Sequence, residues 1–449
     1  MAGFKDRMDV IRRAFQEFLM LPSLIILLFL LLAVGAYMFE RSELTLYSPL
    51  RDFLEARIFA NAAATSELLS TIAGSIITVT SITITLMLLI LQQTASTMST
   101  QVFDQFLRRR SNQFYFGFFI GLALYTLITL ATVDEPFNPV FAAGLAYILT
   151  VITLYLLILL FYATIHQMRP PVIIQAIHDH TLAARQHQYG LLARTRRESQ
   201  FQGSITYQVF ATNHGFVTGI RMDYLAKIVD ETERACEIVL TVSVGSFVAY
   251  NDLLAEIKMT RENGFPQLEQ RVREAIYLER SRNLDNDPAY GIAQLENIAW
   301  TSTSTAKSNP TPGLQVIYSL RDLLARWAVE EPPPAAQEPL PVVYNDNVFD
   351  DLLSAFESLA VVATQSKEHQ ILTGILNAFS TQYHNFPEDW LPQVDETLFR
   401  IVPTLTQHIL TRDLEAAVVN LITEVEEAGQ PALAQFMREA LDRTRIHYR

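Results

Sequence analysis

Residues that commonly carry catalysis are sparse in this 449-residue chain and form no recognised motif. Glycine-rich phosphate loops, the H-E-x-x-H zinc signature and the G-x-S-x-G nucleophile turn are all absent from the sequence. The single cysteine, Cys236, excludes an internal disulfide and every multi-cysteine metal site. It has no paired histidine, so we do not expect it to act as a nucleophile. These observations predict a protein that is not an enzyme and carries no cofactor.

Two groups of polar residues could still bind a metal ion or exchange protons. The histidine group consists of His166, His178, His180 and His187. His180 and His187 share a helical face, but no carboxylate lies at a matching spacing, which favours solvated or headgroup-facing histidines over a metal site. The acidic group, Asp285, Asp287 and Glu296, lies around the sequence DNDPAYG. An Asn-Asp-Pro stretch is typical of a turn and helix cap, and an acid–base or cation-binding role is the alternative.

One apolar segment carries a stripe of hydroxyl and amide side chains. At 100° per residue these side chains fall on one helical face roughly 100° wide, interrupted by Ile82 and Leu89. The stripe consists of Thr71, Ser75, Thr78, Thr85, Gln92, Gln93, Ser96 and Thr100. Hydroxyls in membrane helices either bond to the carbonyl four residues earlier and to neighbouring helices, or line a water-filled path. Both interpretations stay open, and the stripe is a candidate pore lining.

The segments that must position this stripe are long and apolar. Only 18% of the residues are charged, against about 25% in soluble chains, and four stretches have no charged side chain. They are Phe18–Phe39, Leu68–Phe103, Ser111–Val133 and Pro136–Met168. Each provides the ~20 residues that a helix needs to cross ~30 Å of hydrocarbon. We predict a membrane domain at residues 18–168 in contact with the lipid bilayer, with spans at about 21–39, 68–91, 114–133 and 140–162.

Basic residues predict the orientation of these spans. Lys and Arg precede the first span and follow the fourth, whereas the connection between the third and fourth carries only Asp134 and Glu135. Both termini should therefore face the cytoplasm. Within residues 1–17, Phe4, Met8 and Ile11 share one helical face and the basic residues lie off it. This predicts an amphipathic helix in the headgroup layer, or one packed on the protein's own soluble region.

Beyond Met168 the composition becomes that of a soluble protein. This part carries 12 of the 13 net negative charges, which argues against nucleic acid as a partner. We divide it into a juxtamembrane helix at 169–202, a β-module at 203–258, a helical region at 259–330, a Pro-rich linker at 331–341 and a C-terminal helical bundle at 342–449. The predicted fold class is a mainly α membrane protein, with four transmembrane helices followed by a cytoplasmic α+β region.

The β-module resembles the barrel-sandwich hammerhead of biotinyl and lipoyl domains. The resemblance rests on strands separated by turns at Gly215 and Gly245. Those domains carry a lysine in the hairpin turn, where this chain has Asn213-His214-Gly215. The resemblance therefore implies a small structural module and not a cofactor carrier.

A longer stretch resembles a known family. The sequence LLSTIAGSIITVTSITITLMLLILQQTASTMSTQVFDQFLRRRSNQFYFGFFIG is similar to the hallmark of a bacterial predicted-membrane-protein family, domain of unknown function 2254. The blocks LERSRNLDNDPAYGIAQLENIAW and FDDLLSAFESLAVVA also agree with that family, whereas STAKSNPTPG places Ser308-Asn309 where the family has Asn-Asp. The resemblance implies this architecture in the plasma (inner) membrane of a bacterium, and no reaction.

Two functions fit these features. One is an oligomeric channel or other permeation protein, with the second span lining the path and the acidic cytoplasmic region regulating it. The alternative is a membrane-anchored scaffold or sensor that binds a cytoplasmic protein partner. Gly117 and Gly121 form a G-x-x-x-G pair in the third span, which predicts close helix packing. That packing lies either between copies in a homo-oligomer, which we expect, or within one chain.

Overall fold

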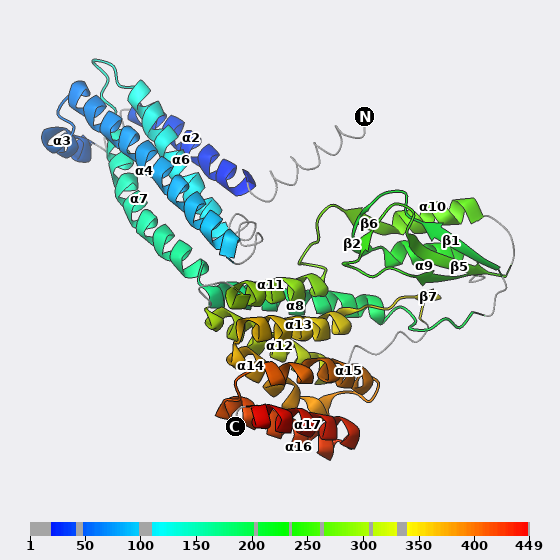
Figure 1. Cartoon of the computed structure of the whole chain (residues 1–449). Helices are drawn as coiled ribbons and strands as arrows, with labels where there is room; N and C mark the ends of the chain where they lie inside the picture. The colour runs from blue at the N-terminus through cyan, green and yellow to red at the C-terminus, as the bar shows by residue number, and fades with distance from the viewer. Residues whose placement is uncertain are drawn as a thin grey trace. The chain divides into compact units, whose positions relative to one another are not determined.

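The structure is a computed structural model of the whole chain. The residues that it describes are 19–41, 48–97, 110–201, 205–232, 236–260, 265–304, 309–329 and 339–447. The chain divides into two compact units, Met1–Arg169 and Pro170–Arg449 (Figure 1). The predicted amphipathic helix of residues 1–17 and most of the predicted Pro-rich linker lie outside the described residues.

Within the described residues, the first unit has four helices long and apolar enough to cross a membrane. They are α2 (Met20–Arg41), α4 (Ala62–Thr97), α6 (Arg110–Ala131) and α7 (Val140–Gln167); the shorter α3 (Ser48–Arg57) precedes α4. The prediction of four membrane helices is therefore confirmed. The helix α4 begins before the apolar stretch because Asn61 caps it, with its side-chain oxygen accepting from the Ala64 N–H at 2.8 Å.

Helix α6 packs on the other three long helices of this unit. Phe29 of α2 lies edge-on to Phe118 of α6, with ring centroids 5.1 Å apart. Tyr125 of α6 donates its hydroxyl hydrogen to the Ala142 carbonyl of α7 at 2.9 Å, and Leu122 is fully buried beside it in the same core. The buried Tyr125 hydroxyl is thus satisfied within the unit, as a polar group in a membrane-embedded bundle must be.

The second unit contains two small sheets that share one hydrophobic core. Their strands are β1 (Ile205–Phe210), β2 (Gly215–Ile220), β3 (Cys236–Leu240), β4 (Phe247–Val248), β5 (Leu253–Met259), β6 (Ile276–Glu279) and β7 (Val342–Val343). One sheet has the order β1-β5-β3-β7, in which only the β3–β7 pair is parallel, and the other has the order β4-β2-β6. The helices α9 (Met222–Glu231) and α10 (Phe265–Ala275) belong to the same part of the chain.

The sheets draw on more of the sequence than the predicted β-module at 203–258. Strand β6 follows α10, and β7 directly follows the predicted Pro-rich linker, at the start of the predicted C-terminal bundle, and pairs with β3. Their side chains complete the core, in which Ile276 and Val342 are buried beside Ile238. Cys236 is buried in strand β3. The barrel-sandwich resemblance itself stays a prediction.

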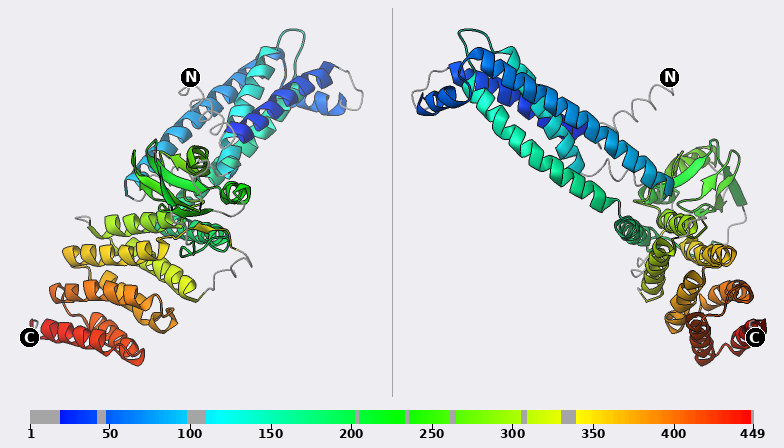
Figure 2. Two further views of the ribbon diagram at one scale, coloured as in Figure 1. Left: turned by 90° about the vertical axis from the view of Figure 1, so that its right-hand side faces the viewer. Right: turned by 60° about the vertical axis from the view of Figure 1, so that its left-hand side comes forward.

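The remainder of the second unit is helical, and its helices stack in layers (Figure 2). They are α8 (Pro170–Leu192), α11 (Pro288–Ser304), α12 (Pro310–Val329), α13 (Val348–Ser366), α14 (His369–Ser380), α15 (Leu391–Ile401), α16 (Arg412–Glu427) and α17 (Pro431–His447). Pro170 is the first residue of α8, a position where a missing N–H costs no helical hydrogen bond. Helices on the two sides of the linker pack directly, α11 on α13 and α12 on α14.

His408 is a buried titratable group in this helical stack. Its imidazole is fully buried, and Nε2 lies 2.9 Å from the Thr364 hydroxyl of α13. Burial, with nearby His369 adding to it, lowers the pKa of His408 to about 4 from the ordinary value of 6.5. The folded protein therefore holds this histidine neutral over a pH range in which the unfolded chain protonates it.

We expect the stability of the second unit to fall as the pH falls from 6.5 to about 4. Over this window only the unfolded chain binds the proton. The free energy of unfolding therefore falls by about 1.4 kcal/mol per pH unit, to a total loss of roughly 3 kcal/mol. His408→Gln should flatten this dependence, whereas His187→Gln on an exposed site should keep it. The pH dependence is measured as the urea midpoint of unfolding at each pH. Tryptophan fluorescence reports on this unit because all three tryptophans lie in it. Equal slopes for the two variants would contradict the account.

Candidate functional site

The polar stripe of α4 lies on an outer face of the first unit. Thr71, Thr78 and Thr85 are exposed, and each hydroxyl donates to the carbonyl four residues earlier at 2.8–2.9 Å. Ser75 and Gln92 are also exposed, whereas the side chains of Gln93 and Ser96, and the whole of Thr100, lie outside the described residues. The three threonine hydroxyls are satisfied by their own helix, so they require neither a water-filled path nor a neighbouring helix.

The glycines of the G-x-x-x-G pair pack within a single chain. A Cβ atom at Gly117 would lie 2.9 Å from the Pro22 Cα, and one at Gly121 would lie 2.5 Å from the Phe29 ring. Both neighbours belong to α2. The close approach that these glycines allow is therefore used between α6 and α2, which is the intramolecular alternative. Gly74 on α4 is different, because nothing lies within 4 Å of a Cβ placed there.

The structure also places a carboxylate that the sequence analysis did not single out. Glu40 in the last turn of α2 is 7% exposed, and its two oxygens accept from the Phe141 N–H at 2.9 Å and the Ala142 N–H at 3.3 Å. These donors are in the first turn of α7, where N–H groups have no partner within the helix. Glu40 is thus a structural cap joining α2 to α7. The sequence feature that could have indicated this role is the position of Glu40 directly after the apolar stretch Phe18–Phe39.

The predicted histidine and acidic groups are dispersed into separate pairs. His178 Nε2 lies 2.8 Å from Asp322, and His180 Nδ1 lies 3.5 Å from Asp285. Asp287 forms two bonds with Arg282 at 2.7 and 2.9 Å and accepts from the Tyr290 N–H at the start of α11. Glu296 is separate from both groups; burial raises its pKa. Across the described ranges, no three His, Cys, Asp or Glu side chains converge as metal ligands would.

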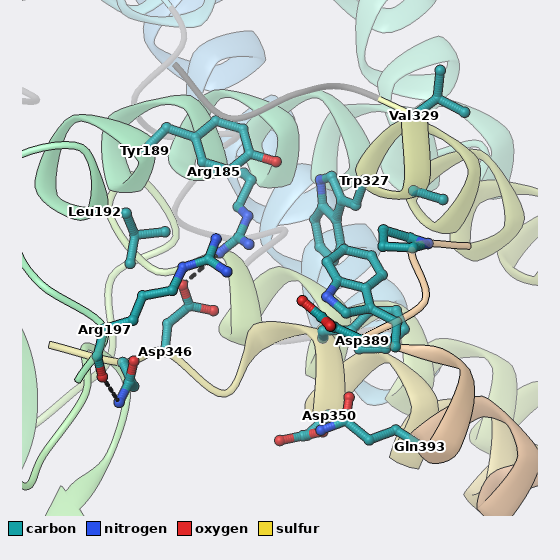
Figure 3. Close-up of a pocket in the computed structure, with 15 residues that line it drawn as sticks. Arg185, Tyr189, Leu192, Arg197, Trp327, Val329, Asp346, Asp350, Asp389 and Gln393 are labelled. Atoms are coloured by element: carbon teal, nitrogen blue, oxygen red, sulfur yellow. Dashed lines mark hydrogen bonds and ion pairs between the residues drawn. The ribbon is translucent and has the colours of Figure 1, made fainter. Parts of the chain in front are cut away.

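A cavity of about 450 Å³ in the second unit brings together residues that are distant in sequence (Figure 3). Helix α8 contributes Arg185 and Tyr189, and the end of α12 contributes Trp327. Phe349 comes from the first turn of α13, and Trp390 immediately precedes α15. Phe349 and Trp390 stack with ring centroids 4.0 Å apart. The walls are therefore aromatic and are held by four packed helices.

A buried ion pair forms one end of this cavity. Arg185 Nη1 lies 3.0 Å from an Asp346 oxygen, and each side chain is 9% exposed. The same nitrogen donates to the Gln188 amide oxygen at 2.8 Å. The Arg185 guanidinium also lies over the rings of Tyr189 and Trp327, 4.8 and 5.4 Å from their centroids. Arg185 and Asp346 point toward each other in Figure 3, with Arg197 beside them.

Two buried donors in this wall have no acceptor. Arg185 Nε and Trp327 Nε1 are shielded from solvent, and neither has a hydrogen-bond partner among the described residues. Arg185 is 7% exposed and Trp327 is 3% exposed. An unsatisfied buried donor costs about 1–3 kcal/mol, and such groups are rare in folded proteins. Both residues line the cavity, so a ligand oxygen that reached either donor would offset this cost.

Carboxylates flank the rest of the opening. Asp350 and Asp389 are exposed lining residues, and Arg197 is the exposed cation among them. Partial burial of its carboxyl group, together with the charge of Asp346, raises the pKa of Asp350. Three carboxylates and two guanidinium groups thus line the cavity, which leaves it with one net negative charge at neutral pH. None of these residues was predicted from the sequence to form a site.

The sequence pattern of a family described as predicted membrane protein (DUF2254) matches residues 16–380. The chain belongs to this family. The DUF2254 match covers all four membrane helices and the cavity residues up to α13, whereas Asp389 and Trp390 lie beyond it. No curated protein and no solved structure matches the chain.

In this DUF2254 protein, Gly121→Val should destabilise the first unit, because the new side chain overlaps the Phe29 ring. Overpacking typically costs about 1–3 kcal/mol. Gly74→Val is the matched control, since a Cβ there meets nothing within 4 Å. The measurement is the fraction of detergent-solubilised protein that stays monodisperse on size-exclusion chromatography after heating. If both variants survive equally, the α2–α6 contact is not needed for folding.

Proposed function

We propose that this DUF2254 protein is a membrane-anchored sensor that binds a protein partner through the Arg185–Trp327 cavity. Its four membrane helices hold it in the plasma membrane, and the unit Pro170–Arg449 lies in the cytoplasm with both chain termini. The observation that carries the proposal is the pair of buried donors, Arg185 Nε and Trp327 Nε1, left without acceptors in the cavity wall.

The construction of the cavity supports a binding role. A volume of about 450 Å³ is within the range of known ligand sites, which are mostly apolar with a few placed polar groups. Arg185 and Trp327 come from helices, so they are held more rigidly than loop residues would be. The unpaired donors cost stability that a partner would recover on binding. By contrast, the Thr71, Thr78 and Thr85 hydroxyls of the candidate pore lining already donate to carbonyls of their own helix.

Photo-cross-linking in intact cells tests this proposal. A photoreactive residue at Gln393, an exposed position in the cavity lining, should give one protein adduct of defined mass. The same residue at Gln435, exposed on α17, should give none. Trp327→Phe removes the Nε1 donor but keeps a ring, and it should reduce the adduct strongly. Equal labelling from both positions, or an adduct indifferent to Trp327→Phe, would contradict the proposal.

A second candidate function is permeation by a homo-oligomer. The observation that favours it is the outer face of α4. Ser75, Thr78 and Thr85 lie on this face, and the described residues of the chain leave them exposed. Gly74 on the same face would allow a second copy to approach closely. This candidate predicts conductance in planar bilayers that Thr78→Val changes, with Thr83→Val, at a buried position of the same helix, as control. Silence across several lipid compositions would reject it.

A further inference from the structure

The groups that line the Arg185–Trp327 cavity restrict the chemistry of its ligand. Arg185 Nε and Trp327 Nε1 both donate, so the ligand must present acceptor oxygens. Tyr189, Phe349 and Trp390 offer ring faces, which favour compact apolar rings. The ligand must satisfy both requirements at once, because the donors and the rings line one cavity.

Simple ions do not meet these requirements. A small anion would find the charge of Arg185 already matched by Asp346 at 3.0 Å, and Asp350 and Asp389 would repel it. A quaternary ammonium ion would suit the rings and the carboxylates, but it has no acceptor for Trp327 Nε1. The ligand therefore combines neutral carbonyl oxygens with apolar rings.

Resting on the proposed function, we infer that the cavity binds a proline-rich segment of the protein partner that carries a basic residue. A polyproline II helix makes no internal hydrogen bonds, so its carbonyl oxygens are free to accept. Its pyrrolidine rings pack in aromatic-lined grooves, and its low conformational entropy reduces the cost of binding. A polyproline II segment therefore offers free carbonyls and compact rings together.

Each lining group then has a defined role. Trp327 Nε1 and Arg185 Nε donate to backbone carbonyls, and the Phe349–Trp390 stack receives the proline rings. Asp389 lies at the opening beside Trp390, where it can pair with an arginine or lysine of the segment. The net negative charge of the lining complements that basic residue.

Fluorescence anisotropy on the full chain in nanodiscs tests this inference. The probe is a labelled, capped peptide of six prolines followed by arginine, and it should bind saturably. Trp327→Phe should weaken binding about tenfold, as loss of one buried hydrogen bond predicts, whereas Trp300→Phe should not change it. Asp389→Asn should weaken the arginine peptide but not a version with norleucine in its place.

The controls separate this inference from the proposed function. If the Gln393 adduct forms in cells and the proline peptide does not bind, the ligand class is wrong and the sensor role stands. If neither occurs, both are wrong. Equal binding of a peptide with alanines in place of prolines would overturn polyproline recognition. Displacement of the probe by tetramethylammonium or inorganic phosphate alone would overturn it in favour of a simple ion.

Discussion

The Arg185–Trp327 cavity depends on the buried ion pair between Arg185 and Asp346. Two charges removed from water are costly unless they meet, and breaking one partner of such a pair is strongly destabilising. Arg185 is fixed by α8, whereas Asp346 lies in the segment that leads from β7 to α13. The pair therefore sets how the chain returns from β7 into α13, and with it the position of Phe349 in the cavity wall.

The same segment connects the cavity to the sheets. Tyr344, between β7 and Asp346, is fully buried, and its hydroxyl accepts from the Val244 N–H at 3.3 Å. The adjacent Gly245 has a φ of +95°, and a Cβ there would lie 2.8 Å from the Asp287 carboxylate. Glycine is therefore required where this turn meets the Arg282–Asp287 pair. A ligand in the cavity would act beside the contact that holds the sheets against the helices.

The membrane helices could be predicted and the cavity could not, for physical reasons. Apolar length alone defines a membrane span, so the four helices follow from local sequence. The G-x-x-x-G pair is also local, but only the structure assigns its contact to Phe29. The cavity brings together Arg185, Trp327 and Trp390, which span 205 positions of the sequence. No periodic pattern in the sequence predicts that these residues lie close together. Strand β7 was missed because two residues pairing with β3 leave no pattern of their own.

The central claim is that the Arg185–Asp346 pair is kept for binding and not for stability. Apolar replacements of similar volume often stabilise a protein at a buried ion pair. The direct measurement is Gln393 cross-linking in the double variant Arg185→Met with Asp346→Leu, alongside its urea midpoint. The account predicts a midpoint equal to or above that of the wild type and no adduct. A double variant that keeps the wild-type adduct would contradict it.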